Sequence, residues 1–164
     1  MVRQAWLGLL LILLPVSFDT AWAQCLTTST NQTCTNSVLL SGGAKGIEDT
    51  ATLTLTNTAS GTVSGTDRGV DAVTANVVNS GTIQGTAASS RGINAATANV
   101  TNSGIVSGDF RGIRVTIANV TNSGTIQATG AAGAGIFATT SATVTNSGTI
   151  SGADQGIWSL GTAT

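Results

Sequence analysis

The sequence Asn-Val-Thr-Asn-Ser-Gly occurs at residues 99–104 and again at 119–124, and Thr-Val-Thr-Asn-Ser-Gly occurs at 143–148. Self-similarity at a fixed period is the signature of a repeat architecture, in which one supersecondary unit stacks on the next. The Asn that precedes Ser-Gly sets the period, with successive spacings of 21, 22, 23, 20 and 24 residues. It recurs at Asn36, Asn57, Asn79, Asn102, Asn122 and Asn146, the first of these in the weaker copy Cys34-Thr35-Asn36-Ser37.

A second landmark, Gly followed by an apolar residue, keeps the same period. It occurs at Gly46-Ile47, Gly69-Val70, Gly92-Ile93, Gly112-Ile113, Gly135-Ile136 and Gly156-Ile157. The consensus is Gly-Ile-x-Ala, a variable link, Ala-x-Val-Thr-Asn-Ser-Gly-Thr-Ile-x-Gly and a loop of variable length. Within these pieces apolar and polar residues alternate, which predicts strands with Val toward a core and Thr toward water.

These strands are short and are separated by Gly-rich corners, so we expect an all-β fold without α-helix after residue 24. The expected fold is a parallel β-helix, or solenoid, of about six coils of 20–24 residues. Each coil should contain three strands and stack on the next at about 4.8 Å, giving a rod about 30 Å long. Val100, Val120 and Val144 should form one inward column.

The Asn column needs a physical reason, because a buried amide without partners costs roughly 1–3 kcal/mol. We expect each Asn side chain to bond the backbone of its own corner and the Asn of the neighbouring coils. Asn also tolerates the left-handed backbone conformation that such corners use. Ligand binding by the column is the alternative. A second column is expected from Arg68, Arg91 and Arg111, with Asp67 and Asp109 nearby, and a solvated rim is favoured over a binding stripe.

The N-terminus has the pattern of a secretory signal peptide. Arg3 precedes the apolar run 7–14, Pro15 follows it, and 21–23 reads Ala-Trp-Ala, a small-x-small cleavage pattern. We expect cleavage after Ala23 and export. A membrane anchor is the alternative, but the run is well short of the roughly 20 residues that cross a bilayer as a helix.

The only two cysteines, Cys25 and Cys34, follow this segment in a chain bound for an oxidising compartment, so a disulfide is expected. A lipoprotein site at Cys25 would need small and apolar residues where Trp22 and Gln24 stand. A zinc site would be two ligands short of a tetrahedron, because the chain has no His. In the register of the repeat, Cys34 stands where later copies have Val.

Composition argues against several functions. A formal net charge of −1 gives no field for nucleic acid, and without His the usual general base is missing. The acidic pairs Asp67 with Asp71 and Glu48 with Asp49 are interpreted as loop charges, and Lys45 beside Gly46 is weak evidence for another base. No Gly-Gly-x-Gly-x-Asp calcium repeat occurs. We therefore expect no enzyme, cofactor, metal site or catalytic residue.

The signal, the close Cys pair and the Val-Thr-Asn-Ser-Gly-Thr-Ile repeats resemble the passenger regions of Gram-negative autotransporter proteins. The resemblance covers the whole chain after the signal and is moderately specific. It implies a right-handed β-helix carried through the outer membrane by a C-terminal β-barrel and displayed or shed as an adhesin. The implied location is the periplasm, then the cell surface or the medium. The implied partners are the translocator barrel and an unidentified host-surface or carbohydrate ligand.

The sequence departs from the family because nothing after residue 150 has the alternating apolar strands of an outer-membrane barrel. Residues 156–164 instead run parallel to 135–143 and stop before the next Val-Thr-Asn-Ser-Gly. This suggests a fragment, a frameshifted gene or a split protein, with an open C-terminal edge that invites end-to-end self-association. The expected segments are a signal at 1–23, an N-terminal piece at 24–45 with the first weak coil, and repeats at 46–164.

The alternative is an ice-binding or carbohydrate-binding β-solenoid secreted on its own. Thr52, Thr54 and Thr56 alternate as they would on an ice-binding face. Later coils offer one or two outward Thr, and the coil length varies between 20 and 24 residues, so we expect their columns to slip out of line. A two-partner secreted adhesin lacks support, because the sole Pro is Pro15 and the Asn-Pro-Asn export motif cannot occur.

Overall fold

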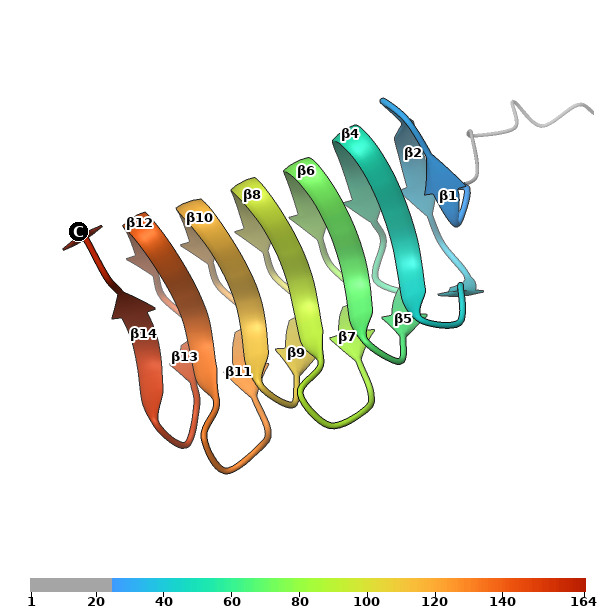
Figure 1. Ribbon diagram of the computed structural model, residues 1–164. Helices are drawn as coiled ribbons and strands as arrows, with labels where there is room; N and C mark the ends of the chain where they lie inside the picture. The colour runs from blue at the N-terminus through green and yellow to red at the C-terminus, as the bar shows by residue number, and fades with distance from the viewer. Residues whose placement is uncertain (1–24) are drawn as a thin grey trace, which may run out of the picture.

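A computed structural model describes residues 25–164, so the expected signal peptide and its cleavage site at Ala23 lie outside the described residues. The described chain is all β and contains no helix, and hence no helix long and apolar enough to cross a membrane. Its strands wind into a solenoid of about six coils, drawn from blue at the N-terminal end to red at the C-terminal end in Figure 1. The expected parallel β-helix is confirmed.

Two parallel sheets form the walls of the solenoid. The nine-stranded sheet contains β1 (Thr28–Ser29), β2 (Thr33–Asn36), β4 (Lys45–Asn57), β6 (Arg68–Asn79), β8 (Arg91–Asn102), β10 (Arg111–Asn122), β12 (Ala134–Asn146), β14 (Gln155–Ser159) and β15 (Thr162–Ala163). The six-stranded sheet contains β3 (Leu39–Ser41), β5 (Thr62–Gly65), β7 (Thr82–Gly85), β9 (Ile105–Gly108), β11 (Thr125–Ala128) and β13 (Thr149–Ser151). Each complete coil therefore has one long strand and one short strand.

The expectation of three separate strands per coil is wrong in this detail. The link between Gly-Ile-x-Ala and Ala-x-Val is not a loop, because pairing between β6 and β8 continues through it. In β6 the inward positions on either side of the link are Ala72 and Ala75, so two residues in succession face outward and the strand turns there. The turn needs no Gly, and the long strands arch accordingly in Figure 1.

Coil length varies without disturbing the stacking. β4 and β12 have 13 residues where β6, β8 and β10 have 12. The extra residue lies in a bulge, between Asp49 and Thr52 in β4 and at the matching place in β12. The remaining variation lies in the loops before the long strands, where 86–90 and 129–133 are longer than 66–67 and 109–110, and in the corner after β4, where 58–61 is longer than 80–81. Equivalent residues consequently stay paired from coil to coil.

The core consists of inward columns. The Gly-apolar landmark contributes Ile47, Val70, Ile93, Ile113 and Ile136, all with no exposed surface. A second column comes from the short strands, and a third contains Cys34, Leu55, Val77, Val100, Val120 and Val144. Val100 and Val120 are buried as expected, whereas Val144 is only partly buried.

In the copies from Asn79 onward, the Gly after Asn-Ser is required by close approach of the backbone rather than by its torsion angle. A Cβ atom on Gly104 would lie 2.1 Å from the carbonyl oxygen of Gly81, and one on Gly124 would lie 2.2 Å from that of Gly104. No side chain fits at such a distance. These glycines let successive corners stack in contact, directly beside the Asn column.

Candidate functional site

The Asn residues predicted from the repeat form one continuous ladder inside the solenoid. The Nδ2 atom of each donates to Oδ1 of the Asn in the next coil, at 2.9 Å from Asn36 to Asn57 and at 2.7 Å in the four later steps. The first five ladder residues are at most 1% exposed, whereas Asn146 is exposed. The ladder runs in one direction, because every donor points toward the C-terminal coil.

Each ladder Asn also bonds the backbone. Asn79 Nδ2 donates to the carbonyl oxygen of Gly81 in its own corner at 3.2 Å and to that of Ile105 in the next coil at 3.1 Å. The structure thus places the amide group between two corners and satisfies it within the protein. The expectation of left-handed backbone at these Asn is wrong, since the positive-φ residues other than Gly in the described chain are Asn31 and Ser89. Asn is needed here for its side-chain amide.

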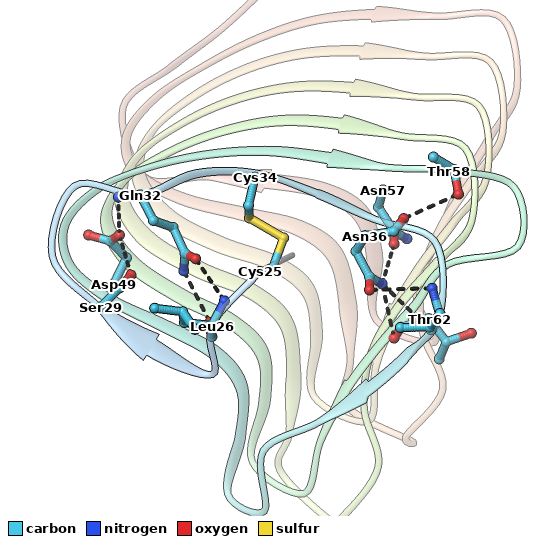
Figure 2. The surroundings of a disulfide bond; sticks show 11 residues. Cys25, Leu26, Ser29, Gln32, Cys34, Asn36, Asp49, Asn57, Thr58 and Thr62 are labelled. Carbon is cyan, nitrogen blue, oxygen red and sulfur yellow. Dashed lines mark hydrogen bonds between the residues drawn. A yellow bond between two sulfur atoms is a disulfide. The ribbon is translucent and has the colours of Figure 1, made fainter. Parts of the chain in front are cut away.

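The N-terminal segment covers one edge of the first coil (Figure 2). Cys25 and Cys34 form the expected disulfide, both 6% exposed, and Cys34 pairs with Leu55 in the Val column. Gln32 holds the segment further, because its side-chain amide accepts from the Leu26 backbone N–H at 3.0 Å and donates to the Leu26 carbonyl at 3.2 Å. The disulfide and the two hydrogen bonds of the Gln32 side chain therefore hold the segment 25–34 together.

Asp49 anchors this segment to β4. It stands in an inward column that holds Ala or Val in the coils from β6 to β12, and it is 2% exposed. Its carboxylate accepts bonds from the Ser29 hydroxyl and from the backbone N–H groups of Asn31, Gln32 and Ala51, at 2.8–3.0 Å. Burial raises the pKa of Asp49, but these hydrogen bonds lower it more, so the net pKa lies below its ordinary value. The interpretation of Asp49 as a loop charge is wrong.

A column of cations runs along the outside of the long strands. It consists of Lys45, Arg68, Arg91 and Arg111, which pair in register. Three residues further along each strand lies an outward column, here called the outer column. It contains Glu48, Asp71, Asn94, Arg114, Phe137 and Trp158. The two columns contact one another, so the expected Arg column exists and is more than a solvated rim.

At the N-terminal end of these columns the charges are paired. Lys45 Nζ lies 2.7 Å from Asp71 and also bonds Glu48, and Arg68 bonds Asp71 at 2.8 Å. Burial raises the pKa of Asp71, but the bonds from Lys45 and Asn94 and the charge of Arg68 lower it more. Glu48 and Asp71 lie on strands rather than in loops, which corrects the sequence interpretation.

At the C-terminal end the charges are not matched in this way. Arg91 lies 3.7 Å from Asp67, and its Nε, like that of Arg68, is buried without a hydrogen-bond partner among residues 25–164. Arg111, 5% exposed, donates to the carbonyl oxygens of Phe110 and Ala132. Burial lowers the pKa of both guanidinium groups, and the positive charge of Arg114 lowers it further. Both remain charged at neutral pH.

A third outward surface covers the C-terminal halves of the long strands. One column there contains Thr33, Thr54, Asn76, Asn99, Asn119 and Thr143. The next contains Thr35, Thr56, Val78, Thr101, Thr121 and Thr145. Most of these residues are exposed, and the columns stay in register, so the expected slippage is wrong. The variation in coil length is absorbed outside these columns.

No group of three or more metal-ligating side chains occurs within residues 25–164. Comparison with protein-family models, curated proteins and solved structures found no match for this chain. The molecule is a β-solenoid with an internal Asn ladder, a disulfide-closed N-terminal segment and two patterned outer surfaces.

Proposed function

We propose that this chain is a structural stalk, a piece of an exported autotransporter-type passenger, and that it performs no catalysis. The observation that carries the proposal is the solenoid itself, whose coils stack in register over the whole described chain. Most of the buried polar residues in the described chain either belong to the Asn ladder or, like Asp49, hold the N-terminal segment. The segment 25–34 protects one edge of the sheet, as a terminal repeat does in solenoids.

Export is the second element of the proposal, and it rests on the apolar run before Pro15 and on the disulfide. The test is expression of the whole chain in a Gram-negative bacterium, followed by fractionation and N-terminal sequencing. We expect periplasmic protein that begins at Gln24 and lacks two hydrogens because of the disulfide. Replacing Ala23 with Arg should leave the uncleaved form. Cytoplasmic protein with an intact N-terminus would refute export.

Display needs a separate experiment, since export alone does not place a protein on the cell surface. The chain is fused at its C-terminus to an outer-membrane translocator barrel, and intact cells are treated with protease. A stalk should appear outside the cell and resist digestion, because its backbone is paired from coil to coil. A fusion that remains in the periplasm, or that is degraded at once, would contradict the passenger role. The control is the same chain exported to the periplasm without the barrel.

A second candidate is binding to ice, and the specific observation that favours it is the pair of in-register columns of Thr and Asn on the outer surface. The test is thermal hysteresis of the purified chain. Thr101→Lys with Thr121→Lys should abolish the activity, whereas Thr82→Lys with Thr125→Lys on the other sheet should preserve it. Absence of hysteresis in the unmodified chain would remove this candidate.

A further inference from the structure

The balance of charge on the outer surface changes along the axis of the solenoid. Around the first two full coils, Lys45 and Arg68 have three carboxylates within 3.3 Å, those of Glu48, Asp67 and Asp71. The positive and negative charges in these ion pairs therefore neutralise each other. No ligand is needed to explain them.

The next coils present the opposite arrangement. The position beside Arg91 that would correspond to Asp71 holds Asn94 in its own coil and Arg114 in the next. Asn94 gives its amide group to Asp71 at 2.7 Å, and its oxygen meets Arg114 at 3.4 Å. Arg114 thus lies beside Asn94 in the coil after Arg91, and after burial its charge is the next cause that lowers the pKa of Arg91.

The nearest acidic groups do not resolve this imbalance. Asp67 is shared with Arg68, which it approaches more closely than it approaches Arg91. Asp109 accepts a bond from the Ser89 backbone N–H at 2.8 Å. Asp154 is exposed and lies in the loop before β14, where it makes no ion pair within the described chain. Arg114 is exposed and forms no ion pair within the described chain, and Arg91, whose side chain is 21% exposed, has only the contact with Asp67 at 3.7 Å.

Aromatic side chains continue the same surface. Phe137 and Trp158 follow Arg114 in the outer column and contact each other edge to face, with ring centroids 5.2 Å apart. The Arg111 guanidinium lies 5.1 Å from the Phe137 ring centroid and 5.5 Å from that of Trp158, so it supports these rings from the side. Both rings remain partly exposed.

We propose that Arg91, Arg114, Phe137 and Trp158 form a binding site for an anionic polysaccharide that lies along the solenoid axis. Two guanidinium groups match a carboxylate or sulfate group through paired N–H donors. The C–H faces of a sugar ring are apolar and pack against an aromatic ring. Because successive coils are about 4.8 Å apart, an extended polymer meets the arginines and then the rings. The site does not depend on whether the chain is a passenger.

The test is calorimetric titration of the whole chain with polygalacturonate, which carries carboxylates, and with dextran sulfate. Neutral dextran controls for the sugar backbone and poly-glutamate controls for charge alone. We expect binding to at least one anionic polysaccharide, no binding to dextran, and binding to poly-glutamate weaker by about tenfold or more. Arg114→Gln, which changes an exposed side chain, and Trp158→Ala should each weaken binding about tenfold or more.

The matched control is the double variant Lys45→Gln with Arg68→Gln, which removes two positive charges from the same surface. It is compared with the double variant Arg91→Gln with Arg114→Gln. Circular dichroism and urea unfolding verify the fold of each variant, and Arg114→Gln alone decides if a double variant does not fold. The proposal is overturned if neither anionic polysaccharide binds, or if the control pair weakens binding as much. Equal binding of poly-glutamate would overturn the assignment to a sugar and indicate an acidic peptide.

Discussion

Replacing Asn102 with Ala tests the ladder in its interior, where the residue is only 1% exposed. The change removes the bond from Asn79 Nδ2 at 2.7 Å and the two hydrogens of Asn102 Nδ2, which serve Asn122, Gly104 and Thr125. Three donor hydrogens at about 1 kcal/mol each, and a buried Asn122 oxygen left without its donor, give a loss of about 3–5 kcal/mol in the free energy of unfolding.

The same change at Asn146 provides the comparison. Asn146 is exposed, so water replaces its bonds to Asn122 and Gly148, and Asn146→Ala should cost about 1 kcal/mol. Asn102→Asp keeps the volume of the side chain but replaces the donor Nδ2 with a carboxylate oxygen, which is charged at neutral pH and faces the carbonyl oxygens of Gly104 and Thr125. At neutral pH it should therefore cost at least as much as Asn102→Ala although it leaves no cavity.

The assay is urea unfolding followed by far-ultraviolet circular dichroism. Native-state hydrogen exchange accompanies it, because coils of a solenoid can unfold separately from one another. Equal losses for Asn102→Ala and Asn146→Ala would refute the argument that burial gives the ladder its strength. A loss below about 1 kcal/mol for Asn102→Asp would refute the role of the donors.

Three further predictions concern the ends and corners of the coils. The Asp49 carboxylate has a lowered pKa in the folded state, so its contribution to stability is complete above about pH 4 and is lost as pH falls through that lowered value. Hydrogen exchange of the backbone amides of 25–34 should then accelerate, and Asp49→Asn should remove this pH dependence. Reduction of Cys25–Cys34 should lower stability by about 2–3 kcal/mol, and urea midpoints with and without reductant measure it; an unchanged midpoint contradicts the prediction. Gly104→Ala should destabilise the fold by more than about 3 kcal/mol, as measured by thermal unfolding, because its Cβ would lie 2.1 Å from a carbonyl oxygen. Gly43→Ala, whose Cβ would meet no atom within 4 Å, should cost only about 1–2 kcal/mol, and equal losses would contradict the steric argument.

Repetition explains why so much of the fold could be predicted. An Asn or an Ile at a fixed place in the repeat has the same environment in every coil that lies between two others, so the burial of Asn79 and Ile93 could be predicted from their spacing alone. The disulfide could be predicted from the expected oxidising compartment and from the two closely spaced cysteines, and the register of the repeat placed Cys34 in the Val column.

Residues that occur once could not be predicted in this way. Asp49 occupies a column of mostly small apolar residues. Its burial is explained by the hydrogen bonds that it accepts from residues 29–32, which fold back over it. The turn within each long strand is another example, since the link residues remain β-paired and carry no turn signal. The environment of Arg111 depends on Phe137 and Trp158, which belong to the next two coils.

The bulges in β4 and β12 and the loops at 86–90 and 129–133 have an evolutionary consequence. In an ordinary sheet, one inserted residue turns every later side chain of the strand to the opposite face. Here the stacked Asn and Ile positions act as anchors that restore the phase in the next coil. A gene of this kind can therefore gain or lose single codons at these places and add sequence to its loops, while the same residues continue to face inward. New surface chemistry can evolve without a new core.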